Sequence, residues 1–244
     1  MAFLPFLHRA LDRENLPAAE ARAAMACILA GEATTAQIAA FAAALRVKGE
    51  TAAELQGLAQ AMRDASTPIP HGITDRPLLD TCGTGGDSQG TINVSTIVAV
   101  VVAACGVAVA KHGNRSLSSQ CGSADLLEAL GMRILTDPLL IARSIREVGF
   151  GFLFAPVMHQ SMKYAQPARA ELKTRTVFNL LGPLTNPAGA TAQLVGAPSV
   201  AAAELMALTL ANLGLPRGYV VHGHDGLDEV STTGQSHMYG IVRG

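Results

Sequence analysis

A glycine-rich run at residues 83–96 lies between two apolar segments, and this order constrains the fold more than any other part of the chain. Residues 77–82 predict a short buried strand, and residues 97–105 predict a buried helix. Where a strand leads through a loop into a helix, free backbone N–H groups and the positive end of the helix dipole converge on one point. The run therefore predicts an α/β structure with a place for an anion where a helix begins.

The residue types in the run suit phosphate. Glycine allows positive φ and lets a phosphate approach without hindrance from a Cβ atom. The run matches neither the Walker pattern nor the dinucleotide-binding spacing, so a tight turn without a ligand remains an alternative for the run taken alone. The candidate residues are Gly83, Gly85, Gly86, Asn93, Ser95 and Thr96.

Asp87 places a negative charge in the same loop. A carboxylate repels a neighbouring phosphate unless a divalent cation lies between them. Mg²⁺ binds through one or two carboxylates together with the phosphates of a substrate. Asp87 therefore indicates a magnesium-bound ligand that carries phosphate.

A basic segment at residues 111–115 follows the next apolar run, residues 107–110. In a parallel sheet, ligands gather at the carboxyl ends of the strands. We therefore expect Lys111 and Arg115 to bring positive charge to the same rim as the glycine run. A solvated basic turn is the alternative for this segment alone.

The first third of the chain predicts helices, because alanine-rich segments carry apolar residues at three- and four-residue spacing. Thr34 with Gln37 and Thr51 with Glu54 match capping boxes at the start of two of them. The three helices are expected near residues 17–30, 35–48 and 52–65.

The rest of the chain alternates between apolar runs and helical segments. One helix is expected to start at Asp137, with Pro138 at its first position, and another to cover residues 199–213. Alternation of this kind predicts a mostly parallel sheet flanked by helices. The apolar runs lie at residues 77–82, 107–110, 150–155, 192–197 and 219–222.

Six motifs, taken together and in order, closely resemble the anthranilate phosphoribosyltransferase family. Each is modest alone, but the ordered set is specific, and the resemblance runs from the N-terminal helices to about residue 231. The motifs are Gly-Thr-Gly-Gly-Asp at 83–87, Asn-Val-Ser-Thr at 93–96, Lys-His-Gly-Asn-Arg at 111–115, Gly-Ser-Ala-Asp at 122–125, Phe-Asn-Leu-Leu-Gly-Pro-Leu-Thr-Asn-Pro at 178–187 and Asp-Gly-Leu-Asp-Glu at 225–229.

The resemblance implies an α/β fold of the nucleoside phosphorylase and phosphoribosyltransferase kind. A small helical domain, residues 1–70, would be completed by a helical insertion at about residues 158–173. It would pack on a larger α/β domain, residues 75–244, that binds phosphoribosyl pyrophosphate. Members of the family continue through several more helices, so we expect the larger domain to be incomplete at its C-terminus relative to them.

The resemblance also implies the reaction: transfer of a phosphoribosyl group from phosphoribosyl pyrophosphate to anthranilate, in tryptophan biosynthesis. It implies Mg²⁺ bound near Ser95, Asp228 and Glu229, and no general base is assigned. An exposed acidic turn is the alternative for the acid pair taken alone. The residues implied for phosphoribosyl pyrophosphate are Gly83, Gly85, Gly86, Asp87, Thr91, Asn93, Ser95, Thr96, Lys111 and Ser119.

Anthranilate needs a cation for its carboxylate and an apolar slot for its ring. Arg169 matches the family position that supplies the cation, and a guanidinium suits bidentate binding of a carboxylate. Gln120 stands where the family usually has a lysine, so one cation near the phosphates is absent. The residues implied for anthranilate are Gly83, His112, Asn114, Arg169, Gly182 and Pro183.

The net charge and the lengths of the apolar runs argue against nucleic acid and membranes as partners. A net charge near −1 gives no electrostatic case for nucleic acid, and no apolar run is long enough to span a bilayer. We expect a cytoplasmic enzyme with small-molecule substrates, and the resemblance implies a homodimer formed through the small helical domain. A pyrimidine nucleoside phosphorylase, or a non-catalytic relative that binds nucleic acid, is the alternative function.

Overall fold

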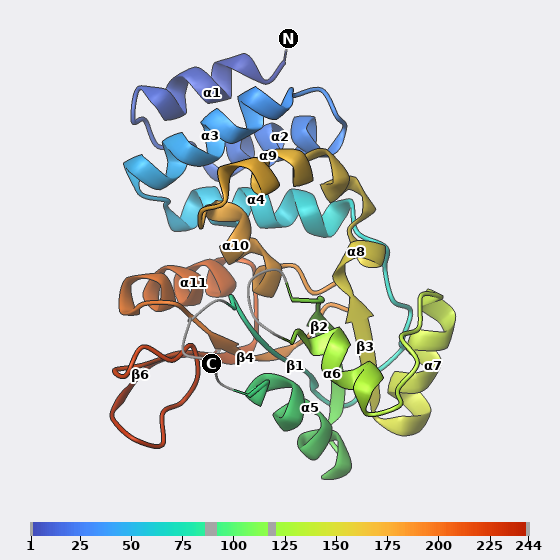
Figure 1. Ribbon diagram of the computed structural model, residues 1–244. Helices are drawn as coiled ribbons and strands as arrows, with labels where there is room; N and C mark the ends of the chain where they lie inside the picture. The colour runs from blue at the N-terminus through green and yellow to red at the C-terminus, as the bar shows by residue number, and fades with distance from the viewer. Residues whose placement is uncertain (1, 86–91, 117–120, 243–244) are drawn as a thin grey trace.

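The computed structural model describes residues 2–85, 92–116 and 121–242 (Figure 1). Two 3₁₀ helices, η1 (Gln160–Tyr164) and η2 (Gly182–Leu184), accompany the regular elements. The α-helices are α1 (Leu4–Leu11), α2 (Ala18–Leu29), α3 (Thr35–Lys48), α4 (Ala52–Asp64), α5 (Val94–Ala104), α6 (Ser123–Ala129), α7 (Pro138–Val148), α8 (Ala155–Met158), α9 (Gln166–Leu172), α10 (Val177–Leu181) and α11 (Val200–Asn212). The strands are β1 (Leu78–Gly83), β2 (Ala108–Gly113), β3 (Phe150–Phe154), β4 (Ala192–Gly196), β5 (Arg217–Gly223) and β6 (Ser236–Val242).

Helices α1 to α4 form a bundle at the top of Figure 1, and α9 from the middle of the chain lies alongside α3. Phe3 and Phe41 pack edge-on in its core, with ring centres 5.3 Å apart. Both predicted capping boxes are present, because Thr34 and Thr51 accept from the backbone N–H groups three residues on. Side-chain capping therefore fixes where α3 and α4 begin.

The sheet has six strands in the order β3-β2-β1-β4-β5-β6. The five pairs are parallel except for β5 with β6, which is antiparallel. The chain moves outward from β1 through β2 to β3, and then outward on the other side from β4 to β6. The direction changes between β1 and β4, which is the place where open α/β sheets bind ligands.

Helices cover both faces of the sheet. Alternate residues of β2 face opposite sides: Val109 packs with α5 and α6, whereas Ala108 and Ala110 pack with α7. Helix α11 packs against β5 and β6, and its Met206 belongs to the same cluster as Val220 of β5. The predicted α/β fold, with a helical bundle packed on a mostly parallel sheet, is confirmed.

Helices α1, α6 and α10 lie outside the expected segments, and α5 begins earlier than expected. Helix α1 is only eight residues long, so its apolar pattern is too short to stand out in the sequence. The helix after the glycine run begins at Val94 and not at residue 97, and it is not buried as expected, because Val100 and Val101 on its outer face are exposed. Among the residues that the structure describes, no helix is long and apolar enough to cross a membrane.

Candidate active site

The carboxyl ends of three neighbouring strands form the rim on which the site is built. β1 ends at Gly83, β2 at Gly113 and β4 at Gly196. The N–H of Thr84 donates to the Gly196 carbonyl at 3.1 Å, so the glycine run leaves the sheet tied to β4. The run therefore starts between β1 and β4, where the direction of the chain connections changes.

Asp228 contacts this loop, although it lies 143 residues after Gly85 in the chain. Its Oδ2 accepts a hydrogen bond from the N–H of Gly85 at 3.0 Å. Two glycines make room for it. A Cβ atom at Gly83 would lie 3.1 Å from Asp228 Oδ2, and one at Gly196 would lie 1.7 Å from the Asp228 carbonyl oxygen. A side chain at position 196 would therefore displace the acidic segment from the loop.

Lys111 lies beneath the rim. Its exposed fraction is 1%, and its Nζ donates to the carbonyl of Thr81 at 2.6 Å and to Ser95 Oγ at 3.3 Å. Burial lowers the pKa of Lys111, and the nearby carboxylates of Asp80 and Glu229 oppose that shift. The ammonium therefore holds the end of β1 to the first turn of α5, with Glu229 close by.

Of the three polar side chains at the start of α5, those of Asn93 and Ser95 have hydrogen-bond partners among the described residues. Asn93 is the residue before the helix, and its Nδ2 donates to the Gly122 carbonyl at 3.1 Å. Ser95 accepts from Lys111, as described above. Thr96 is buried, and its Oγ1 has no hydrogen-bond partner in the described part of the chain. The start of α5 is thus joined to β1, β2 and the loop before α6.

Arg115 does not bring free positive charge to the rim, in contrast to the expectation. Its Nη1 lies 2.9 Å from Asp125 Oδ1 and 2.6 Å from Glu128 Oε2. Asp125 also accepts from the N–H of Gly122 at 2.8 Å, so the ion pairs brace the loop that leads into α6. Neighbouring acids that the sequence pattern does not reveal therefore neutralise this cation.

A second group of predicted residues lies on the opposite face of β2. His112 Nδ1 is 3.2 Å from the Gly182 carbonyl oxygen, and the His112 ring packs edge-on against His159 with centres 5.0 Å apart. Burial, with a smaller contribution from His159, lowers the pKa of His112 to about 3. Burial lowers the pKa of His159 to about 4. Both imidazoles are therefore neutral at pH 7.

Both rings also leave hydrogen-bonding capacity unused. The Nε2 atoms of His112 and His159 are buried and have no partner among the described residues. Buried polar atoms in folded proteins are almost always paired, so an unpaired one needs an explanation. A polar ligand or an ordered water molecule would satisfy these two nitrogens.

Arg169, on α9, is the predicted cation for a carboxylate ligand. It is partly buried, which lowers the pKa of its guanidinium, and the guanidinium lies 5.9 Å from the centre of the Phe178 ring. Its hydrogen bond to Gln166 Oε1 is long, at 3.5 Å. No carboxylate lies within 4.0 Å of it in the described ranges. Arg169 is thus a half-buried cation without a carboxylate partner there.

Asn114 and Pro183 complete the residues predicted for this side. Asn114 follows β2, and its Oδ1 accepts from the N–H of Arg115 at 2.7 Å. Pro183 is buried in η2, directly after Gly182. Of these predicted residues, the structure brings His112 and Gly182 into direct contact.

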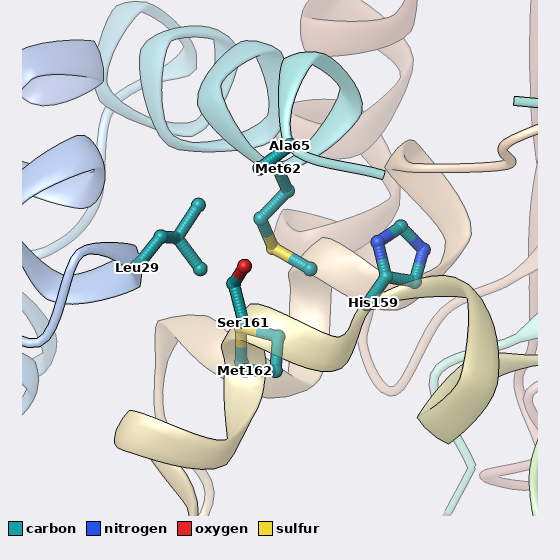
Figure 2. Close-up of a pocket in the computed structure, with 6 residues that line it drawn as sticks. All are labelled: Leu29, Met62, Ala65, His159, Ser161 and Met162. Atoms are coloured by element: carbon teal, nitrogen blue, oxygen red, sulfur yellow. The ribbon is translucent and has the colours of Figure 1, made fainter. Parts of the chain in front are cut away.

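Figure 2 shows a hollow that His159 shares with residues of the helical bundle. It leaves no room for a water molecule. Leu29, Met62, Ala65 and Met162 make most of its lining apolar, and Ser161 adds one hydroxyl. We therefore interpret it as a packing gap at the border of the site.

Four predicted site residues, Gly86, Asp87, Thr91 and Ser119, lie outside the described residues, as does Gln120. Within the described residues, no three His, Cys, Asp or Glu side chains form a metal-sized cluster. Of the three residues expected to bind Mg²⁺, Asp228 contacts Gly85 of the loop, while Ser95 and Glu229 both lie close to Lys111. Hard oxygen donors from one or two carboxylates suit Mg²⁺, which takes its other ligands from substrate phosphates and water.

Sequence reasoning missed two residues of this region. His159 follows α8 in the insertion, and a histidine after the apolar residues 150–158 is the signal that was available. Asp80 lies in the middle of β1 with an exposed fraction of 0%. A carboxylate inside an apolar strand is a visible signal, but its partners are distant in sequence.

Two domains of one known family match this chain. Residues 4–66 match the helical bundle domain of the glycosyl transferase family, and residues 75–244 match the a/b domain of that family. The chain is similar to the anthranilate phosphoribosyltransferase of Solibacter usitatus, with 60% identity over all 244 residues and 72% of that protein. For the enzyme of Moorella thermoacetica the identity is 56%, over 95% of this chain and 68% of the relative.

Solved structures give the same result. The anthranilate phosphoribosyltransferase of Thermus thermophilus superposes with a TM-score of 0.89 at 47% identity, over 97% of this chain and 73% of that one. The enzyme of Saccharomyces cerevisiae in complex with PRPP and Mg superposes with a TM-score of 0.85 at 27% identity, over 98% and 72% of the two chains.

Proposed function

Because this chain belongs to the anthranilate phosphoribosyltransferases of the glycosyl transferase family, we propose that it transfers the phosphoribosyl group of phosphoribosyl pyrophosphate to anthranilate. The products are N-(5-phosphoribosyl)anthranilate and pyrophosphate. The C–O bond at the anomeric carbon breaks, and the anthranilate nitrogen forms the new bond to that carbon. The observation that supports this most is the contact of Asp228 with Gly85, which brings the acid pair to the glycine loop.

The phosphate side uses the rim of β1, β4 and α5. The N–H groups of the glycine loop and of the first turn of α5 would bind phosphate oxygens, since both carry partial positive charge. Lys111 supports that turn from below through Ser95. Asp228 and Glu229 would hold Mg²⁺, which would supply positive charge to stabilise the pyrophosphate leaving group. The relative from Saccharomyces cerevisiae was solved with PRPP and Mg, and this supports the same requirement here.

The anthranilate side uses His112, Gly182, Pro183 and Arg169. Arg169 would bind the carboxylate of anthranilate, because its guanidinium is half-buried beside Phe178. His112 is neutral at pH 7, so it offers a hydrogen bond and not a charge to the amine. A weakly basic aromatic amine loses its proton readily after attack. The reaction therefore needs positioning and stabilisation of the leaving group more than a strong base.

Two further proposals follow from the family. Two copies of the chain are proposed to pair through the helical bundle, where Leu11 and Val47 are exposed apolar residues. Sedimentation velocity checks this, and a single monomer peak would contradict it. Pyrimidine nucleoside phosphorylase activity is the alternative reaction, and it needs inorganic phosphate and a nucleoside instead of Mg²⁺ and phosphoribosyl pyrophosphate.

The decisive experiment follows the loss of anthranilate fluorescence with phosphoribosyl pyrophosphate, in Mg²⁺ and in excess EDTA. The proposal predicts turnover that requires both the pyrophosphate substrate and the metal. Uridine with inorganic phosphate serves as the control for the alternative reaction. Phosphorolysis of uridine without turnover of anthranilate would contradict the proposal.

A further inference from the structure

Asp80 is a buried carboxylate that the proposed reaction does not use. It lies in the middle of β1, and no Lys, Arg or His nitrogen forms an ion pair with it among the described residues. Burial raises the pKa of Asp80, while Lys111 and hydrogen bonds from neighbouring residues lower it. An acid in such a place is costly unless hydrogen bonds compensate for the lost water.

The hydrogen bonds of Asp80 reach the two strands that flank β1. Oδ1 accepts from the backbone N–H of His112 on β2 at 3.1 Å. Oδ2 accepts from Gln193 Nε2 on β4 at 3.4 Å. Asn186, which follows η2, donates from its Nδ2 to the Ala110 carbonyl of β2 at 2.8 Å. Both oxygens of Asp80 therefore accept hydrogen bonds, as an ionised carboxylate requires.

Two partners of Asp80, Gln193 and His112, both contact the turn that contains Gly182 and Pro183. Gln193 Nε2 donates a second hydrogen bond, at 2.9 Å, to the carbonyl of Pro183. His112 Nδ1 lies 3.2 Å from the carbonyl oxygen of Gly182, the preceding residue. Asp80, Gln193, the turn at Gly182–Leu184 and His112 thus form a closed ring of contacts.

The ring lies on the anthranilate side of the sheet. Alternate residues of a strand face opposite sides, so Asp80 and Thr81 point to different faces. Thr81 faces Lys111 and Ser95 on the phosphate side, whereas Asp80 faces the turn that carries Gly182 and Pro183. Neighbouring residues of β1 therefore serve different halves of the site.

We propose that Asp80 is a positioning residue for the aromatic substrate: it fixes His112 and the Gly182–Pro183 turn at one spacing. The proposal rests on the proposed transferase function. An asparagine at this position keeps the shape but replaces one acceptor oxygen with an N–H₂ group, which would face the N–H of His112 or the amide of Gln193. Both neighbours are donors, so the ring would open.

The experiment measures both Michaelis constants in the fluorescence assay for wild type, Asp80→Asn and Gln193→Leu. In Asp80→Asn the Michaelis constant for anthranilate should rise about ten- to a hundred-fold, as expected for a lost hydrogen bond to a charged group. That for phosphoribosyl pyrophosphate should change less than about three-fold. Gln193→Leu keeps the carboxylate and removes its link to Pro183, so it should give the same selectivity with a rise of about two- to ten-fold.

Glu54→Gln is the matched control, because Glu54 is also a fully buried carboxylate but lies in the helical bundle. It should lower the unfolding temperature and leave both Michaelis constants within about two-fold. Gln193→Leu keeps the test decisive if Asp80→Asn does not fold. Equal effects on the two substrates in an active enzyme would overturn the positioning role alone. Absence of anthranilate turnover by the wild type would overturn the transferase function and the positioning role together.

Discussion

Two buried carboxylates, Glu54 in the helical bundle and Asp80 in the sheet, are compensated in different ways. Glu54 accepts from Lys48 Nζ, Leu16 N–H and Thr51 N–H, each at 2.9 Å. Lys48 is 4% exposed and donates as well to Asn15 Oδ1 and to the Gly49 carbonyl. Every charged atom of this pair has a partner inside the bundle, so the arrangement is complete without a ligand.

The region around Asp80 leaves polar groups unpaired. Asp80 itself is satisfied by neutral donors, but the Nε2 atoms of His112 and His159 have no partner among the described residues. Arg169, on α9 beside α3, also has no carboxylate within 4.0 Å in those residues. Complete pairing in the bundle supports stability, whereas the unpaired ring nitrogens of His112 and His159 leave hydrogen-bonding capacity for a ligand.

The largest predicted effect is a loss of unfolding free energy when the buried pair of Lys48 and Glu54 in the bundle is broken. Glu54→Ala leaves Lys48 buried without its partner, which should cost about 3–5 kcal/mol of unfolding free energy. Chemical denaturation measures it. Glu147→Ala, which breaks the exposed pair with Arg143, is the matched control and should cost less than about 1 kcal/mol. Similar losses in the two variants would show that the buried pair has no special role.

The next largest effect is on the Michaelis constant for anthranilate and concerns Arg169. Arg169→Ala should raise the Michaelis constant for anthranilate about ten- to a hundred-fold, or about 1.5–3 kcal/mol, because a charge-assisted contact is lost. Initial rates with each substrate varied in turn measure it. Arg22→Ala, which removes an exposed partner of Asp64, is the control. An equal rise for phosphoribosyl pyrophosphate would mean that Arg169 supports the structure instead.

A third prediction concerns pH and the two buried histidines. An unfolded histidine binds its proton near pH 6.5, whereas His112 and His159 do so only near 3 and 4 when folded. Between these pH values the unfolded chain binds more protons than the folded chain. The unfolding free energy therefore has its full contribution from these histidines above about pH 6.5, and loses it as the pH decreases toward their pKa values in the folded state. The loss between pH 6 and 5 should be about 2 kcal/mol for the pair. Urea unfolding measures it, and His159→Gln should remove about half of the slope; an unchanged slope would contradict burial of a neutral ring.

The smallest effect tests a capping residue. Thr51→Ala removes the acceptor for the N–H of Glu54 and should cost about 1 kcal/mol. Thr51→Ser keeps the hydroxyl and should recover most of this loss. Neither change should alter the Michaelis constants. A change in the Michaelis constant for only one substrate would contradict the assignment of stability to the bundle and of substrate binding to the sheet.

Local signals in the sequence predict the bundle and the sheet well. The capping boxes at Thr34 and Thr51 need only residues three positions apart, and the strands follow from short apolar runs. The glycine run predicts the loop at the end of β1 for the same reason. Helix α1 is not predicted in this way, because it is only eight residues long and buries only Leu7 and Ala10.

Long-range contacts are what the sequence does not reveal. Arg115 looks like a free cation until the structure brings Glu128 to 2.6 Å from it. Asp80 and Gln193 are 113 residues apart, and their contact depends on β1 pairing with β4. Sequence motifs therefore predict the residues of the candidate site. They do not predict the residues that position them, because those contacts join distant parts of the chain.

The most direct test of the division between the two regions is the stabilisation that Mg²⁺ and phosphoribosyl pyrophosphate give to the wild type, Glu54→Gln and Glu229→Gln. A ligand at a hundred times its dissociation constant adds about 2.7 kcal/mol to the unfolding free energy. We predict that Glu54→Gln, although less stable, keeps this increment, and that Glu229→Gln folds as well as the wild type but loses most of it. Loss of the increment in Glu54→Gln with retention in Glu229→Gln would contradict the account.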